Sequence, residues 1–184
     1  SFLEAGLHAY SIRPETREKS PADGKIAGYG KVDERPVALV ANDFTVLGAS
    51  SSQVNMKKMG HMKKTARERG MPLVLLGESS GGRMPDRMGA SGRATIGQDR
   101  EEYRRTRETP WVSTLMGQSY GSSTWYSVIS DVVFARKGAV MAVTSPRVTS
   151  LAIGQDITPE ELGGWKLHTE VTGLVDQAFD TDEE

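Results

Sequence analysis

The stretch TPWVSTLMGQSYGSSTWYSVISD, residues 109–131, decides the fold. Its apolar first part ends at Gly117, a short polar turn follows, and Gly121 and Ser122 open a segment with apolar residues at helical spacing. This order predicts a strand, a tight turn and the start of a helix. The first N–H groups of a helix have no acceptor inside it, and the helix dipole adds partial positive charge there. The turn is therefore a predicted anion or oxyanion site.

The same arrangement occurs once more upstream. Residues 72–76 (PLVLL) form a continuous apolar run, and residues 77–83 (GESSGGR) follow as a second glycine-rich turn. Small residues allow a ligand to approach the backbone closely. Two apolar strands that each end in such a turn predict one shared pocket.

Composition limits the classes of function. The 184 residues include 37% hydrophobic residues and 23 basic against 24 acidic side chains, so nothing in the charge favours nucleic acid. The chain has no cysteine, which excludes disulfides and thiolate zinc sites, and its scattered histidines suggest no metal site. It has no apolar run near the roughly 20 residues of a membrane helix and no signal-peptide pattern. We therefore expect a cytoplasmic protein that does not contact a membrane.

The pattern along the chain predicts one α/β domain over residues 1–184. Residues 1–23 read as a leading segment and linker, and residues 178–184 as an acidic tail or the end of a piece cut from a longer polypeptide. Strands alternate with helices, which is typical of layered α/β folds. The expected elements are a hairpin over residues 24–41, a helix over 53–69 with a serine cap, a charged helix over 98–107, strands over 132–135 and 139–143, and helices starting at residues 145 and 158.

Five motifs in chain order carry a resemblance to a known family. The chain resembles the amino-terminal half of carboxyltransferase subunits of biotin-dependent acyl-CoA carboxylases, of the propionyl-CoA carboxylase β-subunit kind. The motifs are residues 22–30 (ADGKIAGYG), 43–50 (DFTVLGAS), 80–84 (SGGRM), 116–131 with its glycine turn, and 158–164 (TPEELGG) with His168 and Gly173.

The resemblance implies a crotonase-like (ClpP/crotonase) ββα superhelix. It also implies that the active site forms where this half, which holds the acyl-CoA, faces a second carboxyltransferase half or subunit that receives carboxybiotin. The implied partners are that second half, a biotin carboxyl carrier and a biotin carboxylase, in an oligomer. The implied cofactors are biotin on the separate carrier and a coenzyme A thioester as substrate.

In the family reaction, carboxybiotin releases its carboxyl group, the biotin takes the α-proton of the thioester, and the thioester enolate attacks the carbon dioxide. Backbone N–H groups that face the developing negative charge would stabilise it. The resemblance therefore implies that Gly121 and Ser122 are the catalytic residues, acting through their amides. The expected substrate-binding residues are Gly48, Ala49, Ser50, Gly81, Gly82, Arg83, Gly117 and Tyr120.

Two differences from the family pattern stand out. Ser122 occupies a position where the family usually has a second glycine, and a backbone angle open only to glycine would be strained there. The Gly81-Gly82-Arg83 loop also lacks an alanine between its glycines and its arginine. These differences would alter substrate preference or leave a half that binds without catalysis.

Other interpretations stay open. A biotin-linked acyl-CoA decarboxylase of the same fold is one alternative. A crotonase-type hydratase or hydrolase is another and would use Glu78, the carboxylate beside a glycine turn. A non-catalytic scaffolding subunit is the third alternative. No Gly-x-Ser-x-Gly nucleophile motif occurs. His168 is expected to be a hydrogen-bonded structural residue, and the methionines of residues 53–69 are expected to fill the core.

Overall fold

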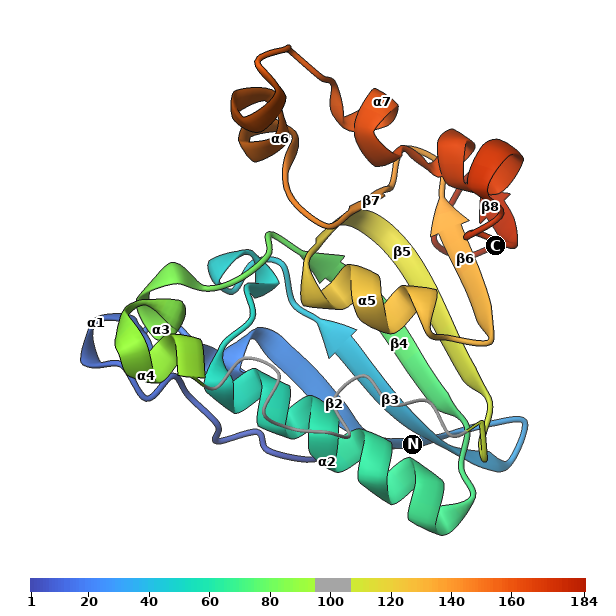
Figure 1. Cartoon of the computed structure of the whole chain (residues 1–184). Helices are drawn as coiled ribbons and strands as arrows, with labels where there is room; N and C mark the ends of the chain where they lie inside the picture. The colour runs from blue at the N-terminus through green and yellow to red at the C-terminus, as the bar shows by residue number, and fades with distance from the viewer. Residues whose placement is uncertain (95–106) are drawn as a thin grey trace.

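The computed structural model describes residues 1–94 and 107–184 and is built on one mixed sheet (Figure 1). The strand order is β1-β2-β3-β4-β5-β6-β8, and β7 pairs with β5 beyond the end of β6. The first three strands pair antiparallel, and β3 to β6 and β8 pair parallel. The strands are β1 Phe2–Glu4, β2 Lys25–Val32, β3 Arg35–Asn42, β4 Leu73–Ser79, β5 Trp111–Tyr120, β6 Val132–Arg136, β7 Val140–Ala142 and β8 Gln177–Phe179.

The predicted hairpin is confirmed. Strands β2 and β3 pair in register from Lys25 opposite Asn42 to Val32 opposite Arg35. The turn between them is Asp33 with φ 47° and a glutamate with φ 64°. Two consecutive residues with positive φ are typical of the tight turns that match the twist of a hairpin.

Helix α2 spans Gln53–Arg69, as the sequence predicted (Figure 1). Ser52 caps it, because the Ser52 side chain accepts from the Asn55 N–H while the Asn55 side chain accepts from the Ser52 N–H. Gly70, with φ 65°, ends the helix in the left-handed conformation. Together with α5 Ser122–Val128, α2 covers one face of the sheet.

The main core lies between these two helices and the sheet. Met59 and Met62 of α2 are 1% and 0% exposed and pack with Leu73 and Trp111 from the strands. The prediction that these methionines fill the core is therefore confirmed. A second cluster, formed by Leu115, Val133, Ala135, Ala139, Met141 and Val175, supports the carboxyl-terminal strands.

The carboxyl-terminal part contains α6 Pro146–Ile153, α7 Pro159–Gly163 and a π-helical turn Leu167–Thr172. The side chains of Ser145 and Thr158 cap α6 and α7, as the sequence suggested. Strand β8 was not predicted. Ala178 and Phe179, which the sequence analysis assigned to an acidic tail, belong to β8, because the Phe179 ring packs edge-on against Phe134 with centroids 5.6 Å apart.

The leading segment contains more structure than a linker. It includes α1 Pro14–Arg17 and the 3₁₀ turn Pro21–Gly24, and two short helices, α3 Met84–Arg87 and α4 Gly89–Ala94, lie at the same end of the molecule (Figure 1). The predicted helix at residues 98–107 falls, except for Arg107, outside the described residues. No helix within residues 1–94 and 107–184 is long and apolar enough to cross a bilayer.

Candidate functional site

The two glycine turns meet in space. A Cβ atom added to Gly121 would lie 3.7 Å from the Cα atom of Gly81. The loop before α2 contacts both turns. The Ser51 N–H donates to the Gly81 carbonyl over 2.8 Å and the Arg83 N–H donates to the Ser51 carbonyl over 2.8 Å, and the Ser51 hydroxyl lies beside the Ser122 hydroxyl. The two turns therefore lie side by side, and the shared pocket that the sequence suggested stays a prediction.

The central turn is tighter and later than the sequence predicted. Strand β5 does not stop at Gly117 but continues to Tyr120, and Gly121 alone makes the turn, with φ 71° and ψ −125°. That conformation is strained for any residue with a side chain. Ser122 is already the first residue of α5, with helical backbone angles. The serine found here in place of a second glycine therefore causes no backbone strain.

Hydrogen bonds from four segments, the loop before α2 and strands β3, β5 and β7, hold the first turn of α5. The Ser122 hydroxyl lies 2.5 Å from the Ser51 hydroxyl. The Ser123 hydroxyl accepts from the Asn42 side-chain amide over 2.8 Å. The Thr124 hydroxyl contacts the carbonyls of Ser119 and Ala142, at 2.8 and 2.9 Å. The orientation of the start of α5 is thus fixed by hydrogen bonds from separate segments of the chain.

One predicted donor is already engaged. The Gly121 N–H donates to the Ala142 carbonyl over 3.3 Å, which attaches β7 to the end of β5. The Gly121 amide, expected to be a catalytic donor, is thus engaged in this structure, and its catalytic role stays a prediction. The Ser122 and Ser123 N–H groups have no acceptor within the part of the chain that the structure describes. They are the donors that the helix start offers.

Several predicted substrate-binding residues form a buried support under the turns. Arg83 is 4% exposed, and its guanidinium pairs with Asp23 and donates to the Ser50 hydroxyl and carbonyl, at 3.2 and 3.1 Å. Ala49 and Ser50 are 2% and 6% exposed. In this structure Arg83, Ala49 and Ser50 thus hold the loop, and the substrate-binding role expected for them stays a prediction.

The remaining predicted residues are distributed around the turns. Gly82 is exposed at the tip of its turn, and Gly48 accepts a hydrogen bond from the Ser80 N–H over 2.9 Å. Tyr120 is 4% exposed, and burial raises the pKa of its hydroxyl. Tyr120 is therefore a packed wall of the turn.

Gly117 has a different function from the one predicted. It lies within β5, and a Cβ atom there would come within 1.8 Å of the Glu78 carboxyl oxygen. Gly117 thus makes room for the Glu78 side chain and not for a bend. Burial raises the pKa of Glu78, Asp182 raises it further and Arg136 lowers it, so the electrostatic surroundings of this carboxyl lie in the carboxyl-terminal part of the chain.

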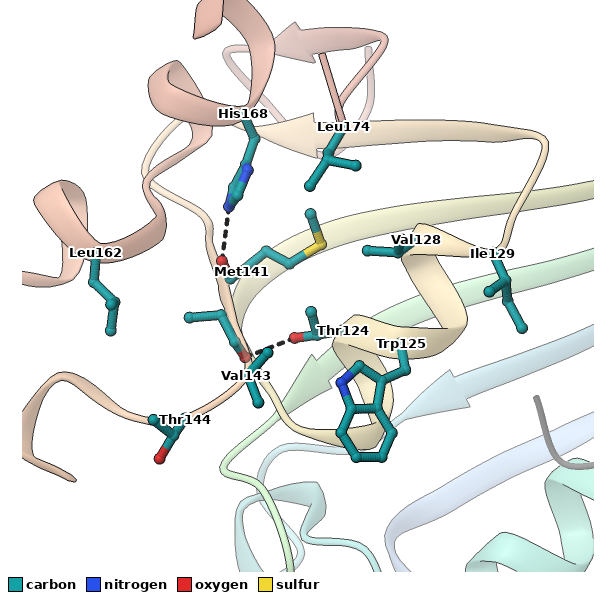
Figure 2. A pocket seen from close by; sticks show the side chains of 11 residues that line it. Thr124, Trp125, Val128, Ile129, Met141, Val143, Thr144, Leu162, His168 and Leu174 are labelled. Atoms are coloured by element: carbon teal, nitrogen blue, oxygen red, sulfur yellow. Dashed lines mark hydrogen bonds between the residues drawn. The ribbon is translucent and has the colours of Figure 1, made fainter. Parts of the chain in front are cut away.

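An apolar cavity of about 660 Å³ adjoins α5 (Figure 2). It opens between α5, β7 and the segment after α7, and none of the ten predicted site residues lines it. Figure 2 shows His168 pointing to the backbone of β7, where its Nε2 lies 2.8 Å from the Met141 carbonyl. The Nδ1 atom lies 3.0 Å from the Thr172 hydroxyl, which confirms the structural role predicted for His168. The lining residues are Thr124, Trp125, Val128, Ile129, Met141, Ala142, Val143, Thr144, Leu162, His168 and Leu174.

The sequence did not predict the residues that hold the start of α5 by hydrogen bonds or pack beside them. Asn42 and Lys25 lie opposite each other at the ends of β3 and β2, and Ser51 lies in the loop before α2. A polar residue at the end of an apolar strand, such as Asn42, is the one signal that could have indicated them. Within the described ranges no group of His, Asp and Glu side chains could hold a metal ion.

Parallel strands, the crossover helix α2 and a second helix that starts from a glycine turn define a crotonase-like fold. The chain belongs to the carboxyl transferase domain family, whose model matches residues 1–184. The five motifs of the sequence thus mark a true family relationship.

Similarity to individual proteins agrees with this. The chain is 34% identical over 171 residues to the carboxyltransferase subunit of propionyl-CoA carboxylase from Haloferax mediterranei, covering 90% of this chain and 32% of that protein. It is 27% identical to the alpha subunit of methylmalonyl-CoA decarboxylase from Veillonella parvula, covering 92% of this chain and 33% of that protein. The crystal structure of hexameric transcarboxylase 12S, with methylmalonyl-coenzyme A bound, matches with a TM-score of 0.86 and 26% identity over all of this chain and 36% of that one. The chain therefore spans about a third of the length of these relatives.

Proposed function

We propose that this chain forms the acyl-CoA-binding half of a biotin-dependent carboxyltransferase. The observation that carries the proposal is the contact between the turns at Gly81 and Gly121, in a chain that belongs to the carboxyl transferase domain family. Relatives named for propionyl-CoA and methylmalonyl-CoA support an acyl-CoA thioester as the substrate class. Carboxybiotin on a separate carrier would supply the carboxyl group.

The chemistry that this half must support is the formation of an enolate. When the carboxyl donor, having released carbon dioxide, takes up the α-proton of the acyl thioester, negative charge would move to the thioester oxygen, and the α-carbon would then form a bond to that carbon dioxide. The Ser122 and Ser123 N–H groups are proposed to donate hydrogen bonds to the thioester oxygen, because they have no acceptor among the described residues. A well-aimed backbone donor stabilises such a charge by about 3 kcal/mol. The Gly121 turn brings the thioester close to these amides without a side chain between them.

The rest of the site is proposed to come from partners. A second carboxyltransferase half or subunit would receive the carrier-bound biotin, and a biotin carboxylase would recharge it. Helix α6 supports such a partner surface, since no residue of α6 is buried and its apolar side chains Val148, Leu151 and Ile153 are more than half exposed. An oligomer in which this face is covered is part of the proposal.

The first test measures thioester binding. The complete protein that contains this chain is titrated with propionyl-CoA and acetyl-CoA in a calorimeter, alongside the variants Gly121→Ala and Gly138→Ala. Both glycines have positive φ, at 71° and 95°, so both substitutions strain the backbone, but Gly138 has no atom within 4 Å of an added Cβ. Gly121→Ala should weaken binding and Gly138→Ala should not. Equal effects would contradict the proposed site, and no binding by the unchanged protein would favour a scaffolding subunit.

A decarboxylase is the second candidate, and the similarity to methylmalonyl-CoA decarboxylase favours it. The two reactions run in opposite directions through the same enolate. Isotopic exchange separates them, since a carboxylase moves labelled carboxyl from carboxybiotin to propionyl-CoA, and a decarboxylase consumes the carboxylated thioester. Measuring both directions with and without the candidate second half identifies the reaction.

A further inference from the structure

Asn42 connects the sheet to the start of α5. Its side-chain amide nitrogen donates to the Glu78 carbonyl over 2.7 Å and to the Ser123 hydroxyl over 2.8 Å. Both of its N–H donors are therefore used, and its carbonyl oxygen is left to accept. The Lys25 Nζ atom lies 2.5 Å from that oxygen.

Lys25 and the Glu78 carbonyl together fix which way the Asn42 amide faces, because the carbonyl can only accept and so requires the amide nitrogen on its side. The two ends of a side-chain amide have nearly the same shape, and the hydrogen-bonding partners decide its orientation. An ammonium group can only donate, so it requires the amide oxygen on its own side. The amide N–H groups are then directed to Glu78 and Ser123.

The packing around Lys25 holds its ammonium group beside the Asn42 oxygen. Its side chain is 8% exposed and borders a cavity of about 20 Å³ between the sheet, α2 and α5. Met59 of α2 and Ser123 and Tyr126 of α5 line the same cavity. A lysine packed in this way cannot turn to solvent, so its ammonium group stays directed at Asn42.

We propose that Lys25 is a positioning residue for the acyl-thioester site, acting through Asn42 on Ser123 and so on the N–H groups of the first turn of α5. This inference rests on the proposed function. The positioning role of Lys25 differs from a purely structural role in one respect. A structural lysine would affect only folding, whereas a positioning lysine also sets how well α5 meets the developing enolate.

The closing experiment compares Lys25→Met and Asn42→Ala with the matched control Ser113→Ala. The Ser113 hydroxyl lies 2.8 Å from the Ser127 hydroxyl, so the control removes a buried sheet-to-α5 contact one turn further along. The first readout is hydrogen exchange of the Trp125 amide, which donates to the Gly121 carbonyl over 3.2 Å and reports whether the first turn holds. The second is kcat and KM for carboxylation of propionyl-CoA by the complete protein with its partners.

Lys25→Met and Asn42→Ala should speed exchange at Trp125 and lower kcat by about threefold to tenfold, the effect of one well-placed hydrogen bond, with little change in KM. Ser113→Ala should change neither quantity. Normal exchange and normal kcat in Lys25→Met would overturn the inference, as would an equal loss in the control. If the unchanged protein does not bind propionyl-CoA, the proposed function fails, and the exchange data still decide whether Lys25 holds the helix. If Asn42→Ala does not fold, Lys25→Met alone decides the outcome.

Discussion

Replacing Lys25 with methionine should change how the stability of the chain depends on pH. Burial lowers the pKa of Lys25 from 10.5 to about 8, with a further lowering by Lys58 and a partial opposing effect from Asp23. A pKa shift of one unit corresponds to about 1.4 kcal/mol. Keeping Lys25 protonated in the folded chain therefore lowers the free energy of unfolding by roughly 3 kcal/mol at neutral pH. Methionine has a similar length and no charge, so it removes that cost.

Whether stability rises or falls with pH depends on whether the folded or the unfolded chain binds more protons. Below pH 8 both the folded and the unfolded chain carry a charged Lys25, and the folded state bears the whole cost. Between about pH 8 and 10.5 the unfolded chain binds more protons, so the stability contributed by this position rises with pH. Above pH 10.5 both states are neutral and the cost is gone. The lost hydrogen bond to Asn42 costs the variant about 1 kcal/mol at every pH.

The assay is urea unfolding at pH 7, 8, 9, 10 and 10.5, followed by tryptophan fluorescence. Lys25→Met should be more stable than the unchanged chain by about 2 kcal/mol at pH 7 and less stable by about 1 kcal/mol at pH 10.5. Lys58, whose pKa burial also lowers, is present in both proteins, so the part of its titration that does not depend on the charge of Lys25 cancels in the comparison. A stability difference that stays constant from pH 7 to 10.5 would refute the reasoning.

Three further predictions concern single contacts. Arg83→Met leaves the Asp23 carboxylate, which is 0% exposed, without its ion-pair partner and should cost about 3 to 5 kcal/mol in urea unfolding; a loss below 1 kcal/mol would show that the pair is not buried in solution. Gly117→Ala places a methyl group where the Glu78 carboxyl lies, so it should lower the melting temperature by several degrees, and the double variant with Glu78→Ala should recover most of that loss; no recovery would contradict the contact. Thr158→Ala removes the two hydrogen bonds of the Thr158 hydroxyl, one accepted from the Glu161 N–H and one donated to the Glu161 carboxylate, and should cost about 1 kcal/mol by the same unfolding assay, whereas an unchanged midpoint would mean that the cap does not stabilise α7.

The sequence predicted the elements well where local chemistry determines them. Helix α2 has the predicted bounds, because a serine cap and a following glycine mark its two ends. The hairpin and the family motifs were also predictable. The end of β5 was placed too early, because a glycine inside a strand looks like a turn signal. At Gly117 the glycine is required by the Glu78 side chain of the neighbouring strand, a contact that a linear pattern does not contain.

The partners of buried charged residues were even harder to predict from the sequence. The regular spacing of residues along a helix cannot indicate that Lys58 of α2 points inward, yet its Nζ atom donates to the carbonyls of Gly6 and Ala22 at 3.2 and 2.9 Å. Likewise, Arg83 belongs to a loop that resembles a substrate-binding motif, but its partner Asp23 comes from sixty residues earlier in the chain. Such pairings depend on how distant segments pack, and only the folded structure contains that information.

Stability and the proposed function place opposite demands on Lys25. A buried ammonium group costs the fold roughly 3 kcal/mol at neutral pH, whereas an apolar side chain of the same length would cost nothing comparable. The same ammonium group, together with the Glu78 carbonyl, orients the Asn42 amide toward Ser123. The variant Lys25→Met should therefore fold more stably at pH 7 and yet turn over more slowly. A lysine with a purely structural role would change stability without changing kcat, so the two measurements together separate positioning from packing.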